Sequence, residues 1–180
     1  MKGIIFNIAE QFIIETYGED ALDEIMASCN LITKEPFVGP GTYPDEDMVE
    51  MVTKGAAKAG ITPAELLSKL GRYSFGKLAE RHPVFLEHHK DAKTFLKTVD
   101  QVIHMEVRKL YNGTALPSFT YEDPSENELI IVYFSERKLY AFMEGLIEGV
   151  AAHFKQAITQ KHKTMEQNGR EVCEFHLHFS

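Results

Sequence analysis

The fold is organised around residues 96–111, which read LKTVDQVIHMEVRKLY. Apolar residues recur here at the spacing that places side chains on one face of an α-helix. They are Phe95, Leu96, Val99, Val102, Ile103, Val107, Leu110 and Tyr111. The spacing predicts one amphipathic helix. At about 100° per residue, His104 falls on the margin of the apolar face, where its ring can point into a pocket.

A histidine in this position has two interpretations. Such a residue is more often packed or half-exposed than a ligand, and the helix alone leaves both interpretations open. The surrounding sequence has to decide between them.

Composition limits the classes of protein to be considered. The chain has 180 residues, 44% hydrophobic and 26% charged, which favours a single globular domain over residues 1–180. A formal net charge of -8 with no basic cluster argues against a nucleic-acid partner. No window approaches the ~20 consecutive apolar residues of a membrane helix, and the N-terminus lacks the features of a signal peptide. Cys29 and Cys173 form no close pair. We therefore expect a cytoplasmic protein without a membrane anchor.

Helical patterns dominate the first two thirds of the chain. Periodicity and capping residues predict helices over residues 3–17, 20–28 and 45–59, with a loop over residues 36–44. Thr62-Pro63-Ala64-Glu65 has the form of a capping box that starts another helix. Because Gly71 and Gly76 interrupt the helical pattern after this box, we expect a helix ending near residue 70, a second over 72–80 and a short one over 83–89.

The chain changes character after Asn112-Gly113. Residues 116–117 and 123–127 have the composition of turns and loops, and the β-branched and aromatic residues 129–135 predict a strand. Helical spacing returns over residues 137–155, where Gly145 and Gly149 permit close approach of another backbone or of a flat ligand. Residues 157–166 and 170–179 around Asn168-Gly169 predict a β-hairpin. The fold class expected is α+β.

A second group of candidate site residues lies at the end of the predicted strand. Tyr133, Ser135 and Arg137 are spaced by two, so in an extended backbone their side chains leave the same face. A guanidinium and two hydroxyls suit carboxylates, although a solvated strand end is the simpler interpretation. Together with His104 and a glycine-spaced apolar helix, these residues are the parts needed to hold a haem.

With these residues in view, the whole sequence resembles the H-NOX family, whose members bind haem, sense nitric oxide or oxygen, and include the haem domain of soluble guanylate cyclase. It opens with Met1-Lys2-Gly3-Ile4-Ile5 and carries Val102-Ile103-His104 where the family has its proximal ligand, with Pro117 thirteen residues later. Tyr133-x-Ser135-x-Arg137 comes next, and then Gly145-Leu146-Ile147-Glu148-Gly149.

The resemblance implies a cofactor, a fold and roles for the site residues. The cofactor would be haem b, iron protoporphyrin IX, held between a helical N-terminal lobe and a mixed lobe with an antiparallel sheet. His104 would be the axial iron ligand. The triplet Tyr133, Ser135 and Arg137 would bind the haem propionates, while Ile5 and Pro117 would press on the porphyrin and bend it.

The resemblance also carries an expectation about the gas that is sensed. Oxygen-binding members place a tyrosine five residues after the motif arginine, where its hydroxyl donates to dioxygen, but this chain has Phe142. Tyr140 is two residues earlier, about 200° away around a helix, and should not reach the same side. The remaining distal wall would be apolar, formed with Phe142 by Phe75, Leu78 and Leu146. We therefore expect a stand-alone bacterial nitric oxide sensor that also binds carbon monoxide and excludes oxygen, with Tyr73 and Ser74 as possible unforeseen donors.

Signalling should then pass to another protein. The sensor uses all 180 residues and supplies no catalytic base or nucleophile, so we expect no enzyme activity and an output in a separate chain. By resemblance, that partner is a histidine kinase or a cyclic-di-GMP enzyme.

Two other interpretations stay open. The chain could be a haem-free regulatory domain in which Arg137 holds a different carboxylate, or a metal-dependent enzyme using His82, His88 and His89, although these have no recognised ligand spacing. Some relatives have a zinc cluster in the last hairpin. His162 and Cys173 remain here, but Met165 stands where another cysteine would align, so we do not transfer that site.

Overall fold

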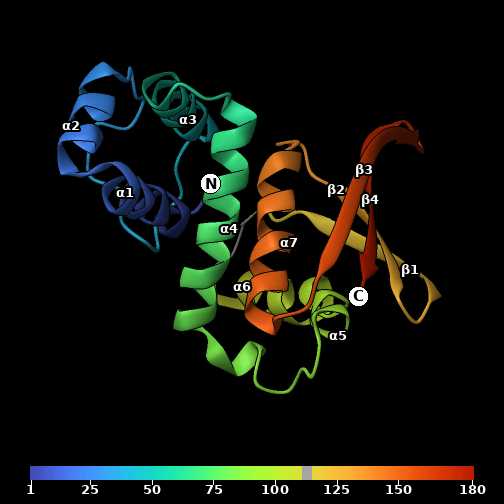
Figure 1. The fold of residues 1–180 in the computed structure, drawn as a ribbon. Helices are drawn as coiled ribbons and strands as arrows, with labels where there is room; N and C mark the ends of the chain where they lie inside the picture. Colours follow the sequence, from blue (N-terminus) through green and yellow to red (C-terminus); the bar gives the residue numbers. More distant parts are fainter. Residues whose placement is uncertain (111–114) are drawn as a thin grey trace. The chain divides into compact units, whose positions relative to one another are not determined.

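The computed structural model describes residues 1–110 and 115–180, and these form an α+β fold. The chain divides into two compact units (Figure 1). The first comprises residues 1–77 and 141–146, and the second residues 78–140 and 147–180. Among the described helices, none is long and apolar enough to cross a membrane.

The first unit is built from helices. It contains α1 (Gly3–Tyr17), α2 (Glu19–Ser28), α3 (Asp45–Ala59), most of α4 (Pro63–Arg81) and the first turns of α7 (Tyr140–Phe154). The predicted helices over 3–17, 20–28 and 45–59 are confirmed to within one residue. Their apolar periodicity places Phe6, Ile8 and Met51 in the core, each at most 1% exposed.

The loop between α2 and α3 is bound to α1 and α3. The ring of Phe37 stacks on Phe6 with centroids 4.1 Å apart, and the amide of Asn7 donates to the Phe37 carbonyl at 2.8 Å. Asp47 is buried and accepts from the backbone N–H groups of Ile32 at 2.6 Å and Thr33 at 3.1 Å. Burial raises the pKa of Asp47, but these hydrogen bonds outweigh it and hold the pKa below its usual value.

Helix α4 is continuous through Gly71 and Gly76, so the predicted division into two helices is wrong. Its start is as predicted, because Thr62 and Glu65 exchange the two hydrogen bonds of a capping box. Glycine is needed in this helix for a different reason, which is close contact with another helix. A Cβ on Gly71 would lie 2.2 Å from the Phe142 carbonyl oxygen, and one on Gly145 would lie 1.9 Å from that of Ser68. Close approach of α4 and α7 requires both glycines, which confirms the expectation for Gly145.

The second unit contains a four-stranded antiparallel sheet in the order β1-β2-β4-β3. Its strands are β1 (Ser118–Ser125), β2 (Glu128–Phe134), β3 (Ile158–Gln167) and β4 (Arg170–Phe179). The hairpin around Asn168-Gly169 is confirmed, and both turn residues have positive φ, 53° and 73°. Strand β1 was not predicted, because Asp123-Pro124-Ser125 has the composition of a loop.

The stretch that organises the chain is not one α-helix. It forms α5 (Ala92–Leu96), a π-helix η2 (Val99–His104) and α6 (Met105–Leu110), while Tyr111 and Asn112-Gly113 lie outside the described residues. Val102, predicted on the apolar face of a regular helix, lies within this π-helix and is 43% exposed. Before α5, a short 3-10 helix, η1 (Pro83–Phe85), replaces the helix predicted over 83–89.

The glycine contacts give a prediction about stability. Gly145→Ala should lower the free energy of unfolding by about 1–3 kcal/mol, because the new Cβ meets the backbone of α4. The matched control is Gly76→Ala, where no atom lies within 4 Å of the new Cβ, so the variant should be about 0.5–1 kcal/mol more stable than wild type. Urea denaturation measures both, and equal effects of the two substitutions would contradict the interpretation.

Candidate functional site

His104 lies at the end of η2 in the second unit, with its ring packed on the sheet. Its side chain is 14% exposed, and its ring centroid lies 5.2 Å from that of Phe119 on β1, with the planes 31° apart. Nδ1 lies 3.4 Å from Oδ1 of Asp100. The histidine is therefore packed on one side and paired with a carboxylate on one nitrogen.

The surroundings of His104 favour its neutral form. Burial lowers the pKa of the imidazole, and Arg108 acts in the same direction. Asp100 and the carbonyl of Pro117 act the other way without reversing the shift. A neutral imidazole has a lone pair that can ligate a metal, and a carboxylate at the other nitrogen fixes its orientation and raises its basicity. Asp100 was not predicted as a site residue, although its position four residues before His104 on a helix was the available signal.

The triplet Tyr133, Ser135 and Arg137 does not lie along one strand. Strand β2 ends at Phe134, and Arg137 belongs to the turn after it, so the predicted shared face is wrong. The turn folds back on itself, because the backbone N–H of Arg137 donates to Ser135 Oγ at 3.2 Å. Nη1 of Arg137 donates to the carbonyl of Ala115 at 2.5 Å, two residues before Pro117. Arg137 and the segment preceding β1 are thus neighbours.

These contacts connect the candidate residues of the second unit. The carbonyl of Pro117 interacts with His104, and Arg137 binds the same segment at Ala115. Tyr133 is buried, and its burial raises the pKa of the phenol, which stays protonated as a donor. The fold therefore brings an imidazole and a guanidinium to residues 115–117, with the hydroxyl of Ser135 bonded to the backbone of Arg137.

Tyr140 is bound to the sheet of the second unit. Its hydroxyl donates to Oε1 of Glu171 at 2.6 Å, and Nζ of Lys138 lies 3.0 Å from the same oxygen. Its ring meets Tyr133 edge-on, with centroids 5.9 Å apart.

The residues predicted to line the distal wall, and Ile5, predicted to press on the porphyrin, are divided between the units. Ile5, Phe75, Phe142 and Leu146 belong to the first unit and Leu78 to the second. Phe75 is 8% exposed, whereas the other four are half-buried. Their grouping in one pocket with His104 stays a prediction.

Two polar residues of α4 have different surroundings. The ring of Tyr73 packs on Phe12 of α1 at 5.3 Å and lies under Nζ of Lys77. Ser74 is fully buried, and its hydroxyl has no hydrogen-bond partner among the described residues. The hydroxyl of Tyr73 is likewise buried without such a partner. A buried hydroxyl without a partner costs about 1–3 kcal/mol, so these are two polar groups of α4 that a ligand or water can satisfy.

The other candidate metal ligands do not form a site. Within residues 1–110 and 115–180, no group of three or more His, Cys, Asp and Glu side chains is placed to hold a metal ion. His82 and His88 are exposed, and His176 and His178 face solvent as predicted. The ring of His162 lies beside Phe175 at 5.2 Å and Tyr140 at 6.3 Å.

The sequence matches the model of a protein family described as Haem-NO-binding over residues 2–162. The chain belongs to this haem-NO-binding, or H-NOX, family. The resemblance seen in the sequence is thereby confirmed. H-NOX domains bind haem, and the family consists of sensor domains that are typically non-catalytic.

Solved H-NOX structures agree over the full chain. An Fe(II) unliganded A71G mutant from K. algicida has 27% sequence identity and a TM-score of 0.90, with 100% of this chain and 97% of that chain covered. An H-NOX protein from S. oneidensis in the Fe(II)NO state has 27% identity and a TM-score of 0.90, with coverage of 100% and 99%. An I5F mutant from T. Tengcongensis, at 23% identity and a TM-score of 0.89 with coverage of 100% and 98%, shares the fold. A search of curated protein sequences finds no match.

The residues present fit the haem of this family. A neutral imidazole suits ferrous iron, and a guanidinium with neighbouring hydroxyls suits the two carboxylates of a haem. This agreement rests on the chemistry of the donor groups in the second unit.

Proposed function

We propose that this H-NOX domain senses nitric oxide at a haem held by His104, binds carbon monoxide in the same way and excludes oxygen. The observation that carries the proposal is the His104 imidazole itself. Burial lowers its pKa and so favours the neutral form, its ring packs beside Phe119, and Asp100 lies at Nδ1. Those are the properties required of a protein ligand to iron.

The other residues have supporting roles in this proposal. Arg137, Ser135 and Tyr133 would hold the propionates, and Ile5 and Pro117 would press on the porphyrin. When bound, haem would supply the ferrous iron for diatomic gases, and nitric oxide would weaken the hold of that iron on His104. His104 would then be released, and η2 and α6, which are continuous with it, would be free to shift. A separate histidine kinase or cyclic-di-GMP enzyme would bind the altered surface.

An absorption spectrum of the purified chain tests the proposal directly. A strong Soret band supports a haem sensor. Protein that folds but acquires no Soret band when haem is added would instead favour the haem-free domain in which Arg137 holds another carboxylate.

The ligand assignment gives the first functional prediction. His104→Gly should leave the fold intact but abolish axial ligation by the protein, and free imidazole should restore the ferrous spectrum. Asp100→Asn is the control, because it alters the partner of Nδ1 but keeps the ring. A glycine variant with the wild-type ferrous spectrum in the absence of imidazole would mean that another residue is the ligand.

The triplet of Tyr133, Ser135 and Arg137 gives the second functional prediction. Arg137→Ala should lower haem retention more than Tyr133→Phe, because it removes a charge-assisted pair worth about 1.5–3 kcal/mol, whereas the phenol contributes about 1 kcal/mol. We expect haem transfer to apomyoglobin to accelerate roughly ten- to a hundredfold and about fivefold, respectively. Lys138→Ala, which changes a neighbouring cation bound to Glu171, should retain haem as wild type does. Equal retention in all variants would remove the propionate assignment.

Gas selectivity depends on the donors near bound gas. Dioxygen carries partial negative charge on its outer atom and needs a donor, while nitric oxide and carbon monoxide bind ferrous iron with little such help. Phe142 offers no donor, the hydroxyl of Tyr140 is bound to Glu171, and the ring of Tyr73 packs on Phe12. The hydroxyls of Tyr73 and Ser74 remain, because both are buried without a hydrogen-bond partner among the described residues.

We therefore expect the reduced protein to keep its ferrous spectrum when opened to air, and to change it with nitric oxide or carbon monoxide. Phe142→Tyr should raise the affinity for oxygen roughly ten- to a hundredfold, the equivalent of one hydrogen bond to a charged group at ~1.5–3 kcal/mol. Tyr73→Phe and Ser74→Ala are the controls for the two remaining hydroxyls. A wild-type spectrum with persistent split α and β bands in air would refute oxygen exclusion, and loss of those bands in one of these controls would identify the donor.

A further inference from the structure

Strand β1 presents a row of three side chains to the segment that carries His104. Phe119, Tyr121 and Asp123 occupy alternate positions, so they leave the same face of the strand. We refer to these three residues as the β1 contact face. Each contacts a different part of residues 92–104, and all of these residues belong to the second unit.

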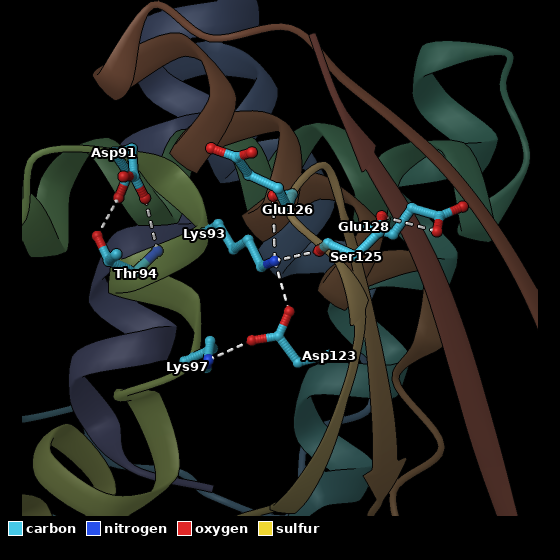
Figure 2. A network of polar contacts seen from close by, with 8 residues as sticks. All are labelled: Asp91, Lys93, Thr94, Lys97, Asp123, Ser125, Glu126 and Glu128. Carbon is cyan, nitrogen blue, oxygen red and sulfur yellow. Dashed lines mark hydrogen bonds and ion pairs between the residues drawn. The ribbon is translucent and has the colours of Figure 1, made fainter.

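The Asp123 end of the contact face is bound to α5 by a network of charges (Figure 2). Nζ of Lys93 lies 2.5 Å from Oδ1 of Asp123 and donates to the carbonyls of Ser125 at 2.6 Å and Glu126 at 3.1 Å. An ammonium group has three donors, and each has an acceptor here. Nζ of Lys97 lies 2.5 Å from the other carboxylate oxygen, Oδ2.

This network is stronger than an isolated surface ion pair. The side chain of Lys93 is only 15% exposed, and its carbonyl partners are the last residue of β1, Ser125, and Glu126 in the turn that follows. Hydrogen bonds from Lys93 and Lys97 hold the pKa of Asp123 below its usual value. The start of α5 is fixed as well, because Asp91 caps it by accepting from the backbone N–H of Thr94 at 2.7 Å.

The middle of the contact face reaches the π-helix. The hydroxyl oxygen of Tyr121 accepts from the backbone N–H of Asp100 at 3.4 Å. Burial raises the pKa of Tyr121 to about 12, so the phenol is protonated at neutral pH. Asp100 is also the residue whose carboxylate approaches Nδ1 of His104, so Tyr121 acts on the histidine through Asp100.

The Phe119 end contacts the histidine directly. Phe119 is 8% exposed, and its ring lies beside the His104 imidazole at 5.2 Å. The segment and β1 therefore run side by side in opposite directions. Asp123 contacts residues 93 and 97, Tyr121 contacts residue 100, and Phe119 contacts residue 104.

We propose that the β1 contact face positions His104 for iron, with Tyr121 and Asp123 as positioning residues, and that it sets how readily His104 leaves iron when nitric oxide binds. This inference rests on the proposed role of His104 as the iron ligand. A segment held before it binds iron loses less conformational freedom on binding, so the bond between His104 and iron is stronger. Loosening the segment weakens that bond by the free energy of the contact removed.

Four conservative variants of β1 test this. Tyr121→Phe removes only the hydroxyl, and Asp123→Asn removes only the charge. Thr120→Val and Glu122→Gln are the matched controls, because these exposed residues lie on the opposite face of the same strand. None of the four changes the length of the strand or a residue of the triplet.

The first measurement needs no haem. Hydrogen exchange at the backbone amides of residues 99–104 in the full chain should be about two- to tenfold faster in Tyr121→Phe than in wild type, which corresponds to one hydrogen bond. Asp123→Asn should accelerate exchange at residues 92–98. Exchange in β3 and β4 should be unchanged, and both control variants should match wild type throughout.

The second measurement uses the haem-loaded chain. In Tyr121→Phe, the iron–histidine stretching frequency of the ferrous protein should fall, and His104 should leave iron about two- to tenfold faster after nitric oxide is added. The inference is overturned if both variants, Tyr121→Phe and Asp123→Asn, match wild type in three quantities. These are the amide exchange rates, the iron–histidine stretching frequency and the rate at which His104 leaves iron. A wild-type chain without a Soret band overturns the proposed function instead, and the exchange measurement distinguishes the two failures because it does not depend on haem.

Discussion

A histidine can serve as an iron ligand only if its ring is neutral and its direction is fixed, and much of the second unit meets this requirement. Burial lowers the pKa of the His104 imidazole and so favours its neutral form, while Asp100 keeps one nitrogen engaged. Burial alone would leave the ring free to rotate, and a carboxylate alone would favour the charged form. The combination of partial burial with a long 3.4 Å contact to Asp100 provides orientation without protonation.

The sequence predicted those elements that are governed by local rules. Helices α1, α2 and α3, the capping box of α4 and the last hairpin result from periodicity, capping and turn chemistry, all of which act over a few residues. The predictions that were wrong concern residues whose role depends on distant segments. Gly71 ends no helix because it makes room for the backbone at Phe142, far away in the sequence, and local composition carries no sign of that contact. Strand β1 was missed because pairing with β2 stabilises residues whose composition favours a loop.

The same distinction applies to the site. His104, Tyr133, Ser135 and Arg137 were found because their order and spacing form a motif, and their assignment to haem still depends on that resemblance. Asp100, Phe119 and Tyr121 belong to no motif. Phe119 contacts His104 only because β1 runs beside η2, and the π-turn sets which side of η2 faces β1. A helix with regular α-spacing through residues 99–104 would present a different side to the strand, so the position of His104 could not be derived from its place on an ideal helix.

The contacts along residues 92–104 weaken towards His104, and this gradient bears on how a signal leaves the site. At Lys93 three acceptors lie within 3.1 Å, at Asp100 the hydrogen bond to Tyr121 is 3.4 Å long, and at His104 ring packing replaces a hydrogen bond to β1. Release of the imidazole would therefore disturb the weakest contacts first. In the proposed mechanism, η2 and α6 move while α5 stays fixed by Lys93 and by Lys97 directly after it. Val102 and Met105 are 43% and 45% exposed on that moving part, so a displacement there changes apolar surface in contact with solvent rather than the core. The structural response to the gas would thus be confined to the segment that carries the ligand, and the cost of repacking the sheet would be avoided.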